Sequence, residues 1–350
     1  MPDATIYFAY PGDLDTATGG YRYDRQVIAE LRASGLTIET LSLPPLVPHP
    51  SQVNLDSVAQ TLAALPDDAV VVIDGLAFGV MEAIAEREAQ RLRLVALCHH
   101  PLALESGLDA AAQRALFESE RRALACARAT IVTSEHTRQI LVEQFAVPAG
   151  RITVALPGTE AVAFAECNGD PVRLLTVATL TQRKGHDVLI EALSMLADLP
   201  WQARFVGGAE FDSTWAAELQ NRTADLGLSE RICFAGAVDS TLVEYPQADV
   251  FALSSRFEGY GMVFAEALAA GLPIVAARAG AVPDVVPETA GILVPPDDSE
   301  ALAAALRAII TDKGLRTKLQ SGARQAAAQL PGWADSAAVV ANALTEVARA

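Results

Sequence analysis

Short apolar runs alternate with longer amphipathic segments along the whole chain of 350 residues. In the first half these runs predict β-strands at 5–10, 36–41, 69–74, 92–97, 129–134 and 151–156. Runs of Val, Ile and Leu without strict alternation are typical of strands buried on both faces, as in a parallel sheet. Between them lie helical patterns such as "YDRQVIAELRASG" (23–35), which ends on Gly35 as a helix C-cap does. The first half therefore predicts a doubly wound α/β domain.

The same pattern begins again after residues 157–171, whose composition predicts a linker. The second series of strands is expected at 172–179, 201–207, 231–236, 249–255, 272–278 and 291–296. We therefore expect two Rossmann-like domains, covering 1–158 and 170–331, with a cleft between the carboxyl ends of their sheets. The last segment, 332–350, predicts a helix that packs back onto the first domain.

Composition restricts the class of partner. The chain is 51% hydrophobic and 20% charged, which is typical of a folded globular protein, and its net charge of −17 argues against nucleic-acid binding. The cysteines, Cys98, Cys126, Cys167 and Cys233, have no spacing typical of a zinc site or a disulfide framework. No stretch approaches the roughly 20 apolar residues of a membrane span, and no signal-type segment precedes the first strand. We expect a cytoplasmic protein with at most peripheral contact at the inner membrane surface.

Two cations stand between the first strand of the second half and the helix that begins near His186. Arg183 and Lys184 in "TQRKGHD" precede Gly185, which permits close approach of the backbone. Cations beside a helix N-terminus form a site for a diphosphate, to which backbone N–H groups also contribute. The alternative is that both are solvated loop charges.

Two glutamates follow the strand "DVFALSS" eight positions apart. Glu258 lies in the glycine-bearing loop "RFEGYG", and Glu266 lies in or near the first turn of a helix that begins near Met262 or Val263. Glu266 could simply complement the helix dipole. Carboxylates repel phosphate but accept hydrogen bonds from a vicinal diol. A nucleotide sugar, which has both a diphosphate and hydroxyl-bearing rings, would satisfy the cations and the glutamates together.

Adjacent histidines end the fourth strand of the first half. His99 and His100 point in different directions on an extended backbone, so we expect one of them to enter a site. A histidine there could bond a sugar hydroxyl or act as acid or base near neutral pH. The alternatives are a structural pair at a strand end or a metal site, and the latter lacks a third ligand at a suitable spacing.

The stretch "PGDLDTATGGYRYD" places Gly19 and Gly20 in the loop after the first strand, before the first helix. This loop lacks the GxGxxG pattern of dinucleotide-binding folds. Asp13 and Asp15 form a D-x-D triplet, which can hold a metal–diphosphate, but they lie in the other domain from the proposed phosphate site. We therefore expect no metal and no cofactor besides the donor substrate.

The run "SSRFEGYGMVFAEALAAGLPIVAARAGAVPDVV" resembles the signature region of retaining glycosyltransferases of the GT-B fold, family 4, described as glycosyl transferases group 1. The spacing of Glu258 and Glu266 resembles that family's E-x7-E motif. "TLTQRKGHDVLIEAL" resembles its donor-phosphate segment, "FVGGAE" its next strand end and "LPGT" its linker. The resemblance is contiguous from about residue 152 to 300 and looser before that. In place of the usual glycine-glycine-x-Pro-Glu the chain has "GAVPD", with Ala281 and Asp284.

The resemblance implies a role for each matching residue. Arg183 and Lys184 would bind the donor diphosphate without a metal, Glu266 the ribose and Glu258 the donor-sugar hydroxyls. His99 aligns with the family's active-site histidine. The other substrate-binding positions implied are Gly19, Gly20, His100, Gly207, Gly259, Tyr260, Gly261, Met262 and Val263.

The resemblance also implies a reaction: transfer of a hexose from a nucleotide sugar to a hydroxyl of a sugar, glycan or lipid-linked acceptor, with retention of anomeric configuration. Alternatives on the same fold are a sugar-phosphate synthase and a nucleotide-sugar epimerase. A third alternative, from another class, is a non-catalytic protein that binds nucleotide sugars. Arg22 and Arg25 are the cations near the glycine loop that a synthase could use for an acceptor phosphate.

Overall fold

The chain forms two compact units in a computed structural model that describes residues 5–47, 50–105 and 107–349. One unit comprises Met1–Gly158 together with Pro331–Ala350, and the other is the continuous segment Thr159–Leu330. The predicted bounds 1–158 and 332–350 include residues 1–4, 48–49, 106 and 350, which lie outside the described residues.

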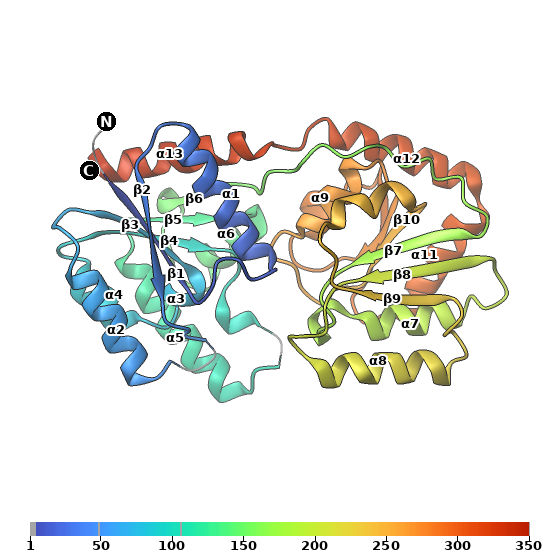
Figure 1. Ribbon diagram of the computed structural model, residues 1–350, viewed down its shortest axis with the longest axis horizontal. Coiled ribbons are helices and arrows are strands. Elements are labelled where there is room, and N and C mark those ends of the chain that lie inside the picture. Colours follow the sequence, from blue (N-terminus) through green and yellow to red (C-terminus); the bar gives the residue numbers. More distant parts are fainter. Residues whose placement is uncertain (1–4, 48–49, 106, 350) are drawn as a thin grey trace. The chain divides into compact units, whose positions relative to one another are not determined.

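The first unit contains a parallel sheet of six strands in the order β2-β1-β3-β4-β5-β6. Its strands are β1 Ile6–Pro11, β2 Ile38–Leu43, β3 Val70–Asp74, β4 Arg93–Cys98, β5 Ala129–Val132 and β6 Ile152–Val154. Its α-helices are α1 Gly19–Ala33, α2 Gln52–Ala63, α3 Gly75–Phe78, α4 Glu82–Glu88, α5 Ala110–Cys126, α6 Glu135–Glu143 and α13 Trp333–Arg349, with short 3₁₀ turns at Leu102–Leu104 and Ala149–Arg151. Figure 1 shows α1 and α13 on one face of this sheet and α2, α4 and α5 on the other.

Helix α1 begins earlier than its apolar pattern suggests, because Thr18 caps it. The Thr18 side chain accepts a hydrogen bond from the backbone N–H of Tyr21, so Gly19 and Gly20 are the first two residues of the helix. The expectation that these glycines lie in the preceding loop is therefore wrong. At the other end Gly35 takes a φ of 92°, the left-handed conformation expected after a helix C-terminus.

Helix α13 belongs to the first unit although the whole second unit separates it in sequence. It packs against α1 and β6, as Figure 1 also shows. The rings of Trp333 and Tyr23 meet edge to face at 6.0 Å, and Arg93 donates a hydrogen bond of 2.9 Å to the carbonyl of Val347. The last helix thus closes one face of the first sheet.

The second unit repeats the architecture, with strand order β12-β11-β10-β7-β8-β9, again all parallel. Its strands are β7 Val172–Val177, β8 Trp201–Val206, β9 Ile232–Gly236, β10 Val250–Leu253, β11 Ile274–Ala277 and β12 Gly291–Val294. Its α-helices are α7 His186–Ser194, α8 Ser213–Asp225, α9 Met262–Ala269, α10 Val282–Val285, α11 Ser299–Thr311 and α12 Lys313–Ala327, with 3₁₀ turns at Gln182–Lys184, Thr241–Val243 and Tyr245–Gln247. Each of the predicted strands in both halves overlaps an observed one, which confirms the doubly wound α/β class.

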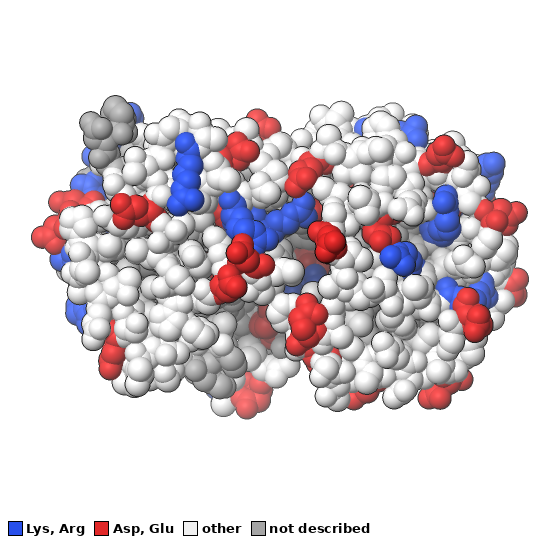
Figure 2. Space-filling model, in the orientation of Figure 1, with Lys and Arg blue, Asp and Glu red and all other residues white. Residues whose placement is uncertain are grey.

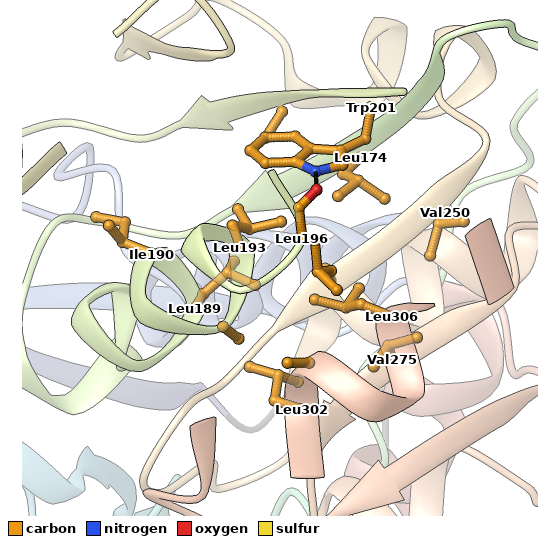
Figure 3. Close-up of a cluster of buried hydrophobic side chains, with 14 of the residues drawn as sticks. Leu174, Leu189, Ile190, Leu193, Leu196, Trp201, Val250, Val275, Leu302 and Leu306 are labelled. Carbon is orange, nitrogen blue, oxygen red and sulfur yellow. Dashed lines mark hydrogen bonds between the residues drawn. The ribbon is translucent and has the colours of Figure 1, made fainter. Parts of the chain in front are cut away.

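The core of the second unit shows why these segments fold in this way. Apolar side chains of β7, β10 and β11 meet those of α7 and α11 in the cluster drawn in Figure 3. Trp201 is 1% exposed, and its indole N–H donates a hydrogen bond of 2.8 Å to the carbonyl of Leu196. A buried indole needs such a partner, so the turn after α7 is fixed by the first residue of the next strand.

Charged side chains of both signs are interspersed over each unit on the face shown in Figure 2. Among the described residues, none of the helices combines the length and the apolar character that crossing a membrane requires.

Candidate functional site

Each sheet has a point where the chain reverses the direction in which it adds strands. In the second unit this point lies between β7 and β10, because β8 lies on one side of β7 and β10 on the other. In the first unit it lies between β1 and β3. Ligands of open α/β sheets bind outside the carboxyl ends of strands at such points. The loops that follow β7 and β10, and those that follow β1, β3 and β4, are therefore the places where a site is expected.

The loops after β7 and β10 are joined by hydrogen bonds to the backbone carbonyls of the first loop. Arg256 N–H donates to the carbonyl of Arg183 at 2.8 Å, and Ser254 Oγ donates to the carbonyl of Gly185 at 2.6 Å. Gly185 has a φ of +66°, and a Cβ at this position would lie 2.1 Å from the Ser254 carbonyl oxygen. Only glycine fits this position, which brings the cation loop directly against the glutamate loop.

The two predicted cations and Glu258 come together at this edge. Lys184 Nζ donates to Glu258 Oε1 at 2.7 Å, and Ser255 Oγ donates to the same oxygen at 2.6 Å. Arg183 Nη1 lies 3.7 Å from Glu258 Oε2 and donates to the carbonyl of Phe257 at 3.1 Å. Burial alone raises the pKa of Glu258, but the charges of Lys184 and Arg183 outweigh it and hold this pKa below its ordinary value. The carboxylate, only 5% exposed, is therefore ionised at neutral pH.

The segment after β11 supports the Glu258 loop from behind. Ala281 N–H donates to the Glu258 carbonyl at 2.9 Å. Gly280 has a φ of +55°, and a Cβ there would lie 2.1 Å from the same carbonyl oxygen, so this glycine is required. Ala281 has a φ of −81°, which any residue adopts. Its departure from the usual second glycine therefore costs no backbone strain.

Glu266 is the fifth residue of α9, beyond its first turn, and is 3% exposed. Tyr245 Oη donates to Glu266 Oε2 at 2.6 Å, so a specific partner holds this carboxylate, and the helix dipole is not needed to explain it. Gly259, Tyr260 and Gly261 form the loop before this helix. Met262 and Val263 lie in its first turn, and Gly207 follows β8, where its N–H donates to the Gly236 carbonyl.

In the first unit, His99 lies directly after β4 and meets two buried carboxylates. Its Nε2 is 3.1 Å from Asp24 Oδ1, on α1, and 3.4 Å from Asp74 Oδ2, at the end of β3. Gly20 lies against the ring, since a Cβ there would be 3.2 Å from His99 Cδ2. The structure thus brings together the predicted residues His99 and Gly20.

His100 has a different partner, since its Nε2 lies 2.9 Å from Glu105 Oε2. The Asp13–Asp15 triplet forms a turn, in which Asp13 Oδ1 accepts the backbone N–H of Asp15. Arg25 donates to the carbonyls of Leu14 and Thr16 and so ties down the same loop.

Sequence reasoning missed Asp24, Asp74, Tyr245 and Ser255, each of which contacts a predicted site residue. One signal was present for Asp24, because it lies on the apolar stripe of α1 with Val27, Ile28 and Leu31. A carboxylate on such a stripe requires a buried partner. Tyr245 gave no comparable signal, because a buried tyrosine is ordinary in a core.

A cavity of about 560 Å³ lies on the second unit, lined by residues that include Arg173, Gln202, Arg204 and Cys233. None of the predicted site residues lines it. Arg204 is already paired with Glu244 at 2.7 Å and Arg173 with Asp249 at 2.9 Å.

In comparisons with known proteins, each half of the chain matches a different family model. The family described as "Glycosyl transferases group 1" matches residues 160–326, and the "Glycosyl transferase 4-like domain" matches residues 13–158. A D-inositol 3-phosphate glycosyltransferase of Xylanimonas cellulosilytica is 31% identical over 252 residues, which are 66% of this chain and 60% of that protein. The match thus spans less than two thirds of that relative's length.

Solved structures share the fold over 97% of the chain. Sucrose-phosphate synthase from Thermosynechococcus elongatus superposes with a TM-score of 0.80 at 21% identity, covering 97% of this chain and 98% of that one. Anabaena Alr3699/HepE in complex with UDP-glucose gives a TM-score of 0.75 at 21% identity, covering 97% and 100%. The two family models together match 13–158 and 160–326, so the chain belongs to the glycosyl transferases group 1 family, the family 4 glycosyltransferases, and the solved structures show that it has the GT-B fold.

Proposed function

We propose that this protein transfers a hexose from a nucleoside-diphosphate sugar to an acceptor hydroxyl, with retention of anomeric configuration and without a metal ion. One observation carries the proposal: Arg183, Lys184 and the ionised Glu258 meet at the switch point of the second sheet. Two cations suit a diphosphate, and a buried carboxylate suits the hydroxyls of the sugar attached to it.

The cations would act on the leaving group. As the bond from the anomeric carbon to the diphosphate breaks, negative charge develops on the phosphate oxygen, and donors fixed beforehand stabilise it. The Lys184 ammonium has three N–H donors, so it can keep its bond to Glu258 and still reach a phosphate oxygen. Glu258 would then be placed for the sugar hydroxyls and Glu266 for the ribose.

Retention would follow if the acceptor hydroxyl attacks the face from which the diphosphate leaves. Attack on that face needs no protein carboxylate as a covalent nucleophile, and the departing phosphate oxygen would take the acceptor proton, so no protein general base is needed either. In this proposal Arg183 and Lys184 supply the charge that a metal ion provides in other transferases.

We assign the acceptor to the first unit, where His99 and Gly20 lie. A sugar, a glycan or a lipid-linked sugar would suit it. The relative from Xylanimonas cellulosilytica is named for D-inositol 3-phosphate, so a phosphorylated polyol belongs among the acceptors to be tested. The proposed location is the cytoplasm, with at most peripheral contact with the membrane.

The test is a thermal-shift screen against UDP, GDP, ADP and their sugars. A ligand that binds only the folded state raises the melting temperature by linkage, so one nucleotide series is expected to stand out. The responding donor is then incubated with acceptors, with and without EDTA. No shift with any nucleotide would refute the proposal, and a reaction that needs Mn²⁺ would transfer the phosphate role to Asp13 and Asp15.

The same screen separates the alternatives. A sugar-phosphate synthase would turn over only with phosphorylated acceptors, and an epimerase would convert the donor sugar without an acceptor. A binding protein would show the thermal shift without any turnover.

A further inference from the structure

Three titratable side chains from distant parts of the chain meet at the carboxyl edge of the first sheet. Asp24 comes from α1, Asp74 ends β3 and His99 follows β4. Asp24 is fully buried, Asp74 is 1% exposed, and the His99 side chain keeps 19% of its surface exposed. Both carboxylates approach the same ring nitrogen, Nε2, at 3.1 and 3.4 Å.

The carboxylates have few other partners. Asp74 Oδ1 accepts the backbone N–H of Leu76 and so caps α3, and its other oxygen is the one near His99. Asp24 Oδ2 is buried and has no hydrogen-bond partner among the described residues. Two carboxylates buried this close together are costly unless a positive charge or a shared proton compensates them. The group that faces both is the imidazole.

The ring itself is held in place. Tyr23 packs edge-on against it at 5.3 Å, and Gly20 lies against another edge, where a Cβ would be only 3.2 Å from Cδ2. Thr133 Oγ1 donates to the His99 carbonyl at 3.3 Å. The second ring nitrogen, Nδ1, makes no hydrogen bond to any described residue. It is also not one of the fully buried polar atoms that lack a partner. It is therefore the ring nitrogen that an incoming molecule can reach.

The titration behaviour agrees with this geometry. Burial lowers the pKa of His99, but its hydrogen bond to Asp24, the proximity of Asp74 and the charges of both carboxylates outweigh burial and raise it to about 10. Burial and the charge of Asp74 raise the pKa of Asp24 to about 7, against the opposing effect of His99. The neighbouring titratable groups are Tyr21 and Tyr23 on α1, with pKa values raised by burial, and Cys98, whose pKa is also raised.

We propose that Asp24 and Asp74 hold His99 as an imidazolium that offers its Nδ1–H to the substrate as a hydrogen-bond donor. Both ring nitrogens then carry protons, so His99 does not act as a general base. Asp24 and Asp74 are positioning residues, which act through His99. That the molecule reached by Nδ1–H is a sugar substrate rests on the proposed function, whereas the protonation state does not.

The test is long-range ¹H–¹⁵N NMR of the imidazole nitrogens of the ligand-free protein from about pH 6 to about pH 11, which spans the ordinary histidine titration and the raised one. The His99→Gln variant assigns the signal. In the wild type both nitrogens are expected to stay protonated up to about pH 9 and to titrate near pH 10. In Asp24→Asn, where one charge is lost and the size is kept, the midpoint is expected to fall by about one to three pH units. Asp13→Asn, on the loop after β1, is the matched control and should leave the midpoint unchanged.

Three results would overturn the proposal. The first is a wild-type His99 that is neutral at pH 7, which remains decisive even if Asp24→Asn does not fold. The second is an Asp24→Asn/Asp74→Asn double variant that folds and has the wild-type midpoint. The third is loss of the Nε2 proton on adding one equivalent of Zn²⁺ or Mn²⁺, which would make the trio a metal site. Because no substrate is present, failure of the proposed transfer reaction leaves these measurements interpretable.

Discussion

The two units share one architecture, but side chains of opposite charge predominate at the switch points of their sheets. At the switch point of the second sheet, two cations surround one carboxylate, Glu258. At that of the first sheet, two carboxylates surround one imidazole, His99. A net positive site suits an anionic diphosphate, and a site with no surplus positive charge suits hydroxyl groups. The fold fixes where the sites lie, and the side chains after the strands decide what each can bind.

The largest effect is expected from Lys184→Ala, which removes the closest cation of the second site. Transfer should fall by about 10³-fold, as when a preorganised donor to a developing charge is removed. Steady-state kinetics measures the loss, and circular dichroism should show an unchanged fold. Lys318→Ala, an exposed lysine on α12, is the control and should keep full activity. An active Lys184→Ala enzyme would show that the second site does not carry the phosphate chemistry.

Glu258→Gln separates the sugar role from the phosphate role within the same site. Transfer should fall by about 10²-fold, because the amide is a weaker acceptor for sugar hydroxyls and no longer holds Lys184 as an ion pair. Binding of the free nucleoside diphosphate, measured by calorimetry, should be kept or become tighter, since the site loses a negative charge. Weaker nucleotide binding in this variant would mean that Glu258 mainly orders the cations.

The two units also shift the pKa of a histidine in opposite directions, and the pH dependence of the free energy of unfolding can measure this difference. His186, at the start of α7, is 1% exposed and has no hydrogen-bond partner for either ring nitrogen among the described residues. Burial, and then the charge of Lys184, lower its pKa to about 3. The native state therefore leaves it neutral, and the unfolded chain takes up a proton below its ordinary pKa of about 6.5, so stability falls as the pH drops from there.

For His99 the sign is reversed, because its pKa is raised. Its contribution is fully present below about pH 6.5 and is lost as the pH rises towards 10. Each group contributes a slope of at most about 1.4 kcal/mol per pH unit to the free energy of unfolding. Denaturant unfolding at a series of pH values should show that His186→Leu flattens the acid limb and His99→Gln the alkaline limb. If each variant flattened the other limb, the contrast between the two units would be wrong.

The smallest effect is expected from Tyr245→Phe, which removes the hydroxyl that donates to Glu266 and keeps the aromatic ring. A net loss of about 1 kcal/mol, or roughly fivefold, should appear in KM for the donor and leave kcat nearly unchanged, because ribose contacts are the same in ground and transition states. Tyr7→Phe, on β1, is the control. A change confined to kcat would place Glu266 closer to the reacting atoms than the ribose.

The fold could be predicted from the sequence because strands buried on both faces have continuous apolar sequences. The loops of Arg183 and Glu258 could also be predicted, since polar residues directly after such runs stand at the carboxyl edge. What could not be predicted is which side chains form hydrogen bonds or ion pairs with residues far away in the sequence. Lys184 and Glu258 are 74 residues apart, and Asp24 and His99 are 75 apart. The apolar pattern also places the start of α1 too late, because this pattern begins several residues after the Thr18 cap.

The return of α13 to the first unit has a consequence for biosynthesis. A ribosome makes 5–158 before 159–330, but the face of the first sheet that α13 covers stays open until 331–349 have emerged. The continuous segment Thr159–Leu330 can fold in the meantime. The first unit is thus completed after the second, and a message truncated before the codons of α13 would yield a finished second unit and an unfinished first one.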